Sequence, residues 1–193
     1  MAQTGGICAM YNQSARPQVQ YTLDTLSNML YRLMESQPFS EITVTALCRA
    51  AGVGRRSYYH NCDTAEDLVI YQIRKKVREN LSQVDFRCED APKLYRLFFE
   101  YWSAQQDFLR ITFREGFSVL FFQEFTKACN QSMNYRLLAE FLEGRQEQHT
   151  LRLFHNAFLV GGLCNVLSFW VQEDFSTPVD LLVDIMLSRK PVV

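Results

Sequence analysis

This chain of 193 residues has little that marks a membrane, secreted or metal-binding protein. No stretch approaches the ~18 consecutive apolar residues that a membrane-spanning helix needs. The N-terminus also lacks the charged and then apolar pattern of a signal peptide. The six cysteines and three histidines do not form the closely spaced pairs that bind zinc. We therefore expect a cytoplasmic chain with free thiols, no metal, no cofactor and no membrane contact.

The sequence is equally poor in catalytic patterns and in β-strand patterns. No Ser-His-Asp, Cys-His or paired-carboxylate arrangement, and no phosphate-binding loop, can be assembled from the spacing of the residues. An enzyme with a helical pocket is thus the functional class that the sequence supports least. Apolar residues recur at helical rather than alternating spacing throughout, which predicts an all-α fold.

The most informative stretch runs from Ile42 to Leu68, ITVTALCRAAGVGRRSYYHNCDTAEDL. Thr43 is a good N-cap for a helix over residues 44–51, which should end at Gly52. The turn over residues 52–54 contains two glycines, which tolerate positive φ and let the next helix leave at a steep angle. The second helix should run from Arg55 to about Asn61. The pattern is that of a helix-turn-helix.

The second helix is crowded with hydrogen-bonding side chains. In a helix-turn-helix this element lies in the major groove of DNA, where arginine pairs with guanine, asparagine pairs with adenine, and serine or tyrosine contacts phosphate. The alternative is a solvated helical turn after a tight bend, because short helix-turn-helix patterns produce many false matches.

The flanking segments favour the DNA-binding interpretation. Residues 18–36 form an amphipathic pattern that ends before Pro38, and Thr64 with Asp67 forms a start signal for a further helix. Residues 18–82 resemble the N-terminal DNA-binding domain of the TetR/AcrR family of transcriptional regulators. The resemblance is carried by the run 38–44 (PFSEITV), AGV at 51–53, Arg55, the tyrosine pair 58–59, and Asp67-Leu68.

The resemblance implies roles for individual residues. Thr43 and Tyr59 match family positions that contact phosphates. The positions that face the groove are Arg55, Arg56, Ser57, His60 and Asn61. Two residues depart from the family: Cys62 replaces an aromatic residue, and Ala65 replaces a lysine that often contacts phosphate. Loss of that lysine should reduce the salt dependence of DNA binding by roughly one unit of slope.

Charge is distributed unevenly along the chain. The total is −1, with +2 in residues 1–87 and −3 in residues 88–193. DNA binding depends on the local field more than on the total, so this small asymmetry is compatible with it. The basic run from Arg74 to Arg78 is interpreted as a solvated helical face.

Residues 83–193 should form a second helical domain, after an N-terminal flexible arm (1–17) and the DNA-binding domain (18–82). A polar connector is expected around residues 82–91. Separate helices are expected over 117–129 and around 135–142, followed by a long helix over about 147–172. Thr177 should cap a last helix in which Pro178 is the first residue.

Two further uses of this domain follow from the resemblance. The family encloses a ligand pocket between such helices, and pockets are mostly apolar. The aromatic candidates for its lining are Phe99, Trp102, Phe113, Phe117 and Phe121. The end of the long helix resembles the family's two-fold dimer seam, with small residues and apolar anchors at Phe158, Gly161, Gly162 and Trp170. The alternative there is an intramolecular packing face.

Together these features predict a homodimeric TetR-like regulator that binds an operator in double-stranded DNA. By family resemblance we expect a repressor that a small apolar effector releases. The competing hypothesis is a regulator-derived module that acts through protein contacts without sequence-specific DNA binding.

Overall fold

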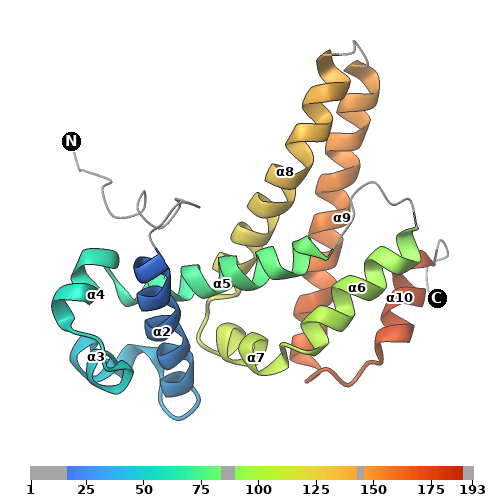
Figure 1. Ribbon diagram of the computed structural model, residues 1–193. Helices are drawn as coiled ribbons and strands as arrows, with labels where there is room; N and C mark the ends of the chain where they lie inside the picture. The colour runs from blue at the N-terminus through green and yellow to red at the C-terminus, as the bar shows by residue number, and fades with distance from the viewer. Residues whose placement is uncertain (1–16, 84–89, 143–145, 189–193) are drawn as a thin grey trace. The chain divides into compact units, whose positions relative to one another are not determined.

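The computed structural model describes residues 17–83, 90–142 and 146–188. Every regular element within these ranges is a helix, which confirms the all-α class (Figure 1). Residues 1–16 of the expected N-terminal arm and the middle of the expected connector lie outside the described residues, whereas residue 17 of the arm belongs to the first helix. None of the helices in the described ranges combines the length and the hydropathy needed to cross a bilayer. The chain divides into two compact units, Met1–Lys75 and Lys76–Val193.

The described part of the first unit consists of α2 (Pro17–Met34), the short 3-10 helix η1 (Phe39–Glu41), α3 (Val44–Ala51), α4 (Arg55–Asn61) and the first half of α5 (Ala65–Ser82). Pro17 opens α2, where its missing N–H costs nothing, and Pro38 prevents the helix from continuing. The fully buried core residues of this unit include Leu26, Leu30, Met34, Leu47, Tyr58 and Leu68.

Polar contacts fix α5 against α2 at the edge of that core. The Tyr71 hydroxyl and the Lys75 ammonium both donate to Asp24 Oδ1, at 3.1 and 2.6 Å. Next to them, Gln72 Nε2 donates to Asn28 Oδ1 at 2.6 Å. The start of α5 is held as its sequence predicts, because Asp67 Oδ2 accepts from the backbone N–H of Thr64 at 2.8 Å.

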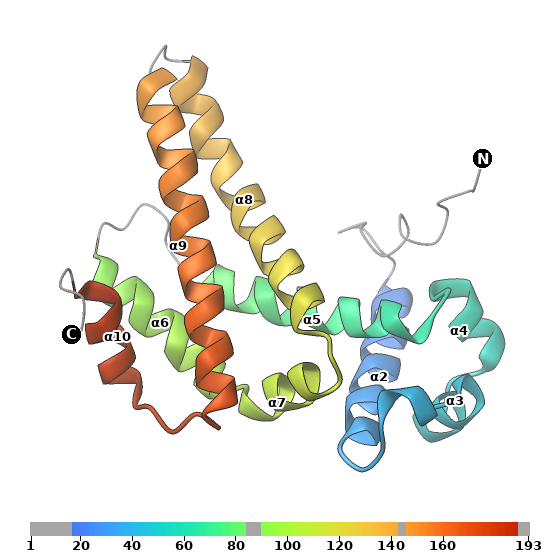
Figure 2. The same cartoon turned by 180° about the vertical axis from the view of Figure 1, so that it is seen from behind.

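The second unit consists of the rest of α5, α6 (Ala91–Ser103), α7 (Gln106–Arg114), α8 (Ser118–Leu142), α9 (Gln146–Gln172) and α10 (Val179–Leu187). Helices α8 and α9 form a long antiparallel pair (Figures 1 and 2), and α6 packs against α10. The division between the units falls inside α5, before the expected boundary at residue 82. The second half of α5 contacts α6, since the Tyr101 hydroxyl donates to Glu79 Oε2 at 2.9 Å.

Two details of this unit differ from the expectation. The two segments expected over 117–129 and 135–142 are joined in one continuous helix, α8, which begins at Ser118, because residues 130–134 contain neither glycine nor proline to end it. Pro178 is the N-cap of α10 rather than its first residue. Thr177 does not cap the helix, since its hydroxyl donates to Glu173 Oε2 at 2.8 Å.

Candidate nucleic-acid interface

The turn between α3 and α4 is built by local hydrogen bonds. Thr43 Oγ1 accepts from the Ala46 N–H at 3.2 Å and caps the start of α3. At the other end Gly52 is left-handed, with φ 65° and ψ 23°. The Gly52 N–H bonds to Arg49 O at 3.3 Å, and the Val53 N–H bonds to Cys48 O at 3.0 Å. This pair of bonds is the Schellman motif, which ends a helix and redirects the chain.

The bounds of α3 and α4 agree with those that the sequence predicts. Of the two turn glycines, Gly52 alone has positive φ, whereas Gly54 is extended at φ −66°. Glycine is therefore required for its backbone conformation at residue 52 but not at residue 54.

Helix α4 is anchored by one tyrosine and presents the next to solvent. Tyr58 is fully buried, whereas Tyr59 is 61% exposed, and the two rings meet edge to face at 5.2 Å. Arg55, Arg56 and His60 are also exposed. Neither arginine forms an ion pair with a carboxylate in the part of the chain that the structure describes, so both guanidinium groups are available for anions.

Two of the predicted DNA-contacting residues are less accessible. Asn61 Nδ2 donates to Ser57 O at 2.7 Å within α4, and both residues are half-buried. The predicted phosphate contact Thr43 is exposed, although its oxygen already accepts a hydrogen bond at the start of α3. The exposed members of the predicted set are thus Thr43, Arg55, Arg56, Tyr59 and His60.

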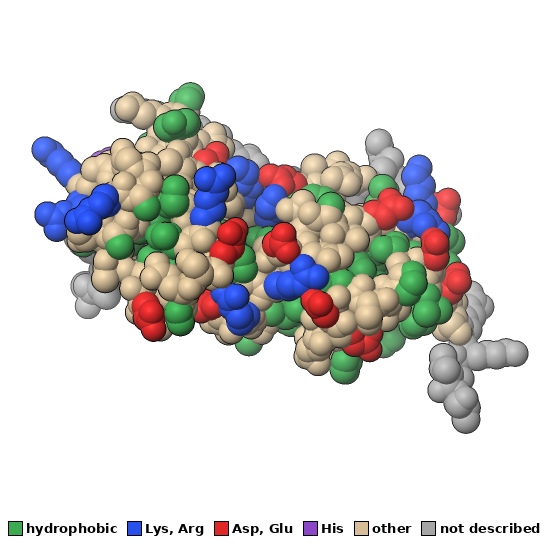
Figure 3. All heavy atoms as spheres, turned by 90° about the horizontal axis from the view of Figure 1, so that it is seen from below, with side chains coloured by type: hydrophobic (Ala, Val, Ile, Leu, Met, Phe, Trp, Pro, Cys, Tyr) green, Lys and Arg blue, Asp and Glu red, His purple; other side chains and the backbone are tan. Residues whose placement is uncertain are grey.

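The local charge of this segment is positive. Residues 42–62 contain three arginines, Arg49, Arg55 and Arg56, and no aspartate or glutamate. All three are exposed, and basic side chains project from the part of the surface that α3 and α4 form (Figure 3). A local excess of this kind attracts phosphates even when the total charge of the chain is near zero.

Cys62, one of the two residues that depart from the pattern behind the expected resemblance, is a core residue. Its side chain is 3% exposed and fills a core position at the end of α4. Burial, reinforced by Asp67 and Asp63, raises the pKa of the Cys62 thiol to about 12. The residue is therefore a small core side chain and not a reactive thiolate. Ala65 is half-buried at the start of α5 and contributes no charge.

In the second unit, the aromatic residues predicted to line a pocket pack against each other. Phe99, Trp102 and Phe121 are fully buried, and Phe117 is 7% exposed. Ring centroids lie 5.0 Å apart for Trp102 and Phe121, and 5.9 Å apart for Phe113 and Phe121. These rings form an interlocked cluster in the unit's core.

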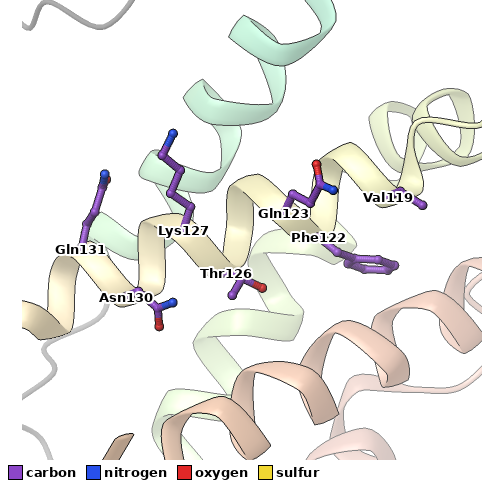
Figure 4. A pocket seen from close by; sticks show the side chains of 7 residues that line it. All are labelled: Val119, Phe122, Gln123, Thr126, Lys127, Asn130 and Gln131. Carbon is purple, nitrogen blue, oxygen red and sulfur yellow. The ribbon is translucent and has the colours of Figure 1, made fainter.

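A separate hollow of about 690 Å³ lies on α8, open to solvent. It is lined by Val119, Phe122, Gln123, Thr126, Lys127, Asn130 and Gln131, which follow one side of the helix (Figure 4). None of the predicted pocket residues lines this hollow.

Sequence reasoning missed a buried polar residue in the second unit. Asn80 of α5 has no solvent exposure, and neither of its amide atoms has a hydrogen-bond partner among the described residues. The same holds for Trp102 Nε1. The sequence does contain a signal for this burial, because the helical register of α5 places Asn80 on the same face as the apolar residues Ile73 and Val77.

The residues predicted for the dimer seam fall on two sides of α9. Phe158 is 77% exposed, and a Cβ built on Gly161 or Gly162 would meet nothing within 4 Å. Trp170 is instead 2% exposed, and its Nε1 donates to Thr177 O at 2.8 Å. The expectation that Trp170 anchors a second copy is corrected: its side chain packs inside its own unit.

Comparison of the chain with protein-family models, curated proteins and solved structures gives no match. The functional interpretation accordingly rests on the residues and on their geometry.

Proposed function

We propose that this chain is a DNA-binding protein that uses α4 as its recognition helix. More particularly, we propose a TetR-like transcriptional regulator, a homodimeric repressor that a small-molecule effector releases from its operator. The observation that carries the proposal is the combination of two short helices, α3 and α4, joined by a glycine turn, with exposed arginines on α4 that have no carboxylate partner among the described residues.

The accessible groups on α4 suit the two kinds of contact that DNA recognition requires. Arg55 and Arg56 can each form a bidentate pair with guanine in the major groove, or bind phosphate. Tyr59 carries a hydroxyl on a ring that is 61% exposed and can donate to a phosphate, which fixes position without reading sequence. Asn61 is tied to Ser57, so base reading is assigned first to the arginines.

A second copy of the chain is supported by the outer face of α9. This face consists of Leu151, Phe154, Phe158 and Phe169, which are 65–77% exposed. At 3.6 residues per turn they share one side of the helix. The opposite side carries Val160, Cys164, Leu167 and Trp170, all buried within the unit. Four large apolar residues on one exposed face mark an interaction surface more often than a solvated one.

A selection experiment on random DNA tests the proposed binding and needs no defined operator. The full chain is incubated with a library of randomised duplexes, and the bound fraction is sequenced over successive rounds. We expect enrichment of a two-fold symmetric sequence, because two recognition helices read half-sites about one helical turn apart. The Arg55→Ala/Arg56→Ala double variant should fail to enrich it.

The same experiment distinguishes this proposal from the competing hypothesis. If the wild-type chain enriches no sequence, or if the double variant enriches the same sequence as strongly, α4 is not a recognition helix. A regulator-derived module acting through protein contacts would then be the better interpretation.

A further inference from the structure

Helix α3 presents polar side chains to solvent beside the proposed recognition helix. Its inner side is formed by Leu47 and Cys48, which are 0% and 3% exposed. Thr45 and Arg49 lie on the opposite side and are exposed. They are four residues apart, which places them one above the other along the helix. The exposed edge of α3 therefore carries one hydroxyl and one guanidinium group.

Arg49 has no counter-ion among the described residues, since no carboxylate there pairs with it. The segment 42–62 also contains Arg55 and Arg56, and it has no aspartate or glutamate. Burial raises the pKa of the Cys48 thiol, and the charge of Arg55 partly offsets this effect, so the field of α4 reaches the end of α3. Positive charges on two packed helices repel each other, and an anion held against both helices relieves that repulsion.

The hydroxyl of Thr45 remains available as a donor because of its place in the helix. A helical threonine usually donates to the carbonyl four residues earlier, as Thr22 and Thr25 do to Gln18 O and Tyr21 O at 2.9 and 2.8 Å. Thr45 is in the first turn of α3, and the residue four positions before it precedes the N-cap. Its hydroxyl accordingly makes no hydrogen bond within the described ranges.

The alternative for Arg49 is a purely local role. It lies in the last turn of α3, where a cation offsets the negative end of the helix dipole. Arg32 is an exposed arginine in the last turn of α2 and provides a control for that effect. The alternative does not account for Thr45, which is uncharged and lies at the other end of the helix.

We infer that Thr45 and Arg49 form a phosphate-binding edge on α3, which holds the DNA backbone beside the groove that α4 enters. The inference rests on the proposed DNA binding and adds a second element to that site. In a helix-turn-helix the first helix crosses the backbone while the second lies in the major groove. Contacts to phosphate fix the position of the protein and carry no sequence information, so this edge adds affinity without specificity.

The charged and the neutral donor make different contributions, which single variants separate. The full-length variants Arg49→Ala, Arg49→Lys, Thr45→Val and Arg32→Ala are titrated by anisotropy at several salt concentrations. The two DNA probes are the duplex enriched by selection with the wild-type chain and a scrambled duplex of the same length. Circular dichroism and urea unfolding check that each variant is folded, and Arg49→Gln serves if Arg49→Ala is not.

Removing one cationic contact from each of two bound copies should lower the slope of log K against log salt by about 1.8. Arg49→Ala should thus weaken binding roughly 30-fold at 0.15 M salt and roughly tenfold at 0.3 M salt, on the enriched and the scrambled duplex alike. Arg49→Lys should keep the slope, because lysine also binds phosphate as a point charge. Thr45→Val should weaken binding roughly fivefold for each bound copy, equally at all salt concentrations. Arg32→Ala should bind like the wild type.

Three results would overturn the inference. One is an Arg49→Ala variant with the same slope and affinity as Arg32→Ala, which would restrict Arg49 to its helix. Another is wild-type affinity in Thr45→Val, and the third is a changed enriched sequence in either variant, which would indicate base reading. Failure of the proposed function is recognised separately, because the wild-type chain would then enrich no sequence, or the Arg55→Ala/Arg56→Ala variant would enrich the same one.

Discussion

Truncation of Phe158 should dissociate the proposed dimer without unfolding the chain. A phenylalanine side chain buries on the order of 200 Å², and Phe158 is 77% exposed. A second copy would therefore remove about 150 Å² of its apolar surface from water. At ~25 cal/mol per Å² this burial contributes about 4 kcal/mol per copy.

The effect on the association constant follows from symmetry. Both copies lose the ring in Phe158→Ala, while part of the nominal gain is offset by the ordering of side chains at the interface. The burial of both rings nominally contributes about 8 kcal/mol. Taking about half of this sum leaves ~4 kcal/mol, which corresponds to roughly 1,000-fold weaker association. Gly162→Glu should act in the same direction, since a Cβ at this position meets nothing within 4 Å in the single chain.

Fluorescence-detected sedimentation from nanomolar to micromolar concentration measures this change directly. Tyr21→Ala is the matched control, because Tyr21 is a similarly exposed aromatic residue, at 73%, in the first unit. We expect it to dimerise like the wild type, while circular dichroism shows unchanged helix content in all variants. A wild-type monomer at micromolar concentration, or an unaltered dimer in both α9 variants, would refute the assignment of this face.

Three other perturbations test the first unit. Arg55→Ala or Arg56→Ala should cost about 1–3 kcal/mol of operator affinity where the arginine pairs with guanine, or mainly reduce the salt dependence of binding where it contacts phosphate. Anisotropy titrations at several salt concentrations distinguish these outcomes, and Arg32→Ala is the charge-matched control. Gly52→Ala should destabilise the fold by about 1–2 kcal/mol because its φ is 65°, whereas Gly54→Ala should be nearly neutral; equal urea midpoints for the two variants would contradict the turn geometry. The pKa of Cys62 is raised to about 12 in the folded chain, so the thiol's contribution to stability should be present at neutral pH and should be lost as the pH rises from about 9, where the unfolded thiol ionises first. In Cys62→Ala the urea midpoint should therefore fall less steeply with rising pH.

The parts of the fold that the sequence predicts best are those set by short-range interactions. Thr43 and Gly52 each act within a few residues, one by accepting the Ala46 N–H and the other by adopting the left-handed conformation. Their residue types therefore suffice to locate both ends of α3. The start of α5 is equally local, since Asp67 bonds to the backbone three residues before it.

Long-range packing decides the features that the sequence did not reveal. Trp170 is followed by a turn in which Asp174 and Phe175 both have positive φ without being glycine. Arg110, which is distant in sequence, holds this turn through a 2.7 Å ion pair with Asp174 and a position 5.0 Å from the Phe175 ring. The residue types of this turn do not predict its conformation. Without knowledge of the turn, the burial of Trp170 could not be predicted from the sequence.

Helix α9 illustrates a different limit. Apolar residues cover two opposite faces, so hydrophobic periodicity alone does not reveal which face packs inside the unit. The structure separates them by burial: Leu167 is 1% exposed, whereas Phe154 is 74% exposed. Helical register alone places Phe158 and Trp170 roughly 120° apart around this helix, but only the tertiary arrangement shows that the side with Trp170 is the buried one.

Helix α5 is the element through which the proposed effector site and the proposed recognition helix would be coupled. It begins shortly after α4 and extends to Ser82, about 26 Å further along at 1.5 Å per residue. An effector bound in the second unit would change DNA affinity only if it bound the operator-competent and the released conformations unequally, because equal affinity shifts nothing. A coupling of about 1–3 kcal/mol weakens operator binding roughly 5- to 150-fold, and the operator must weaken ligand binding by the same factor. Calorimetric titration of an effector, once one is found by screening, into the free chain and into the operator complex measures that factor. Identical affinities in the two titrations would show that the site, even if occupied, does not control DNA binding.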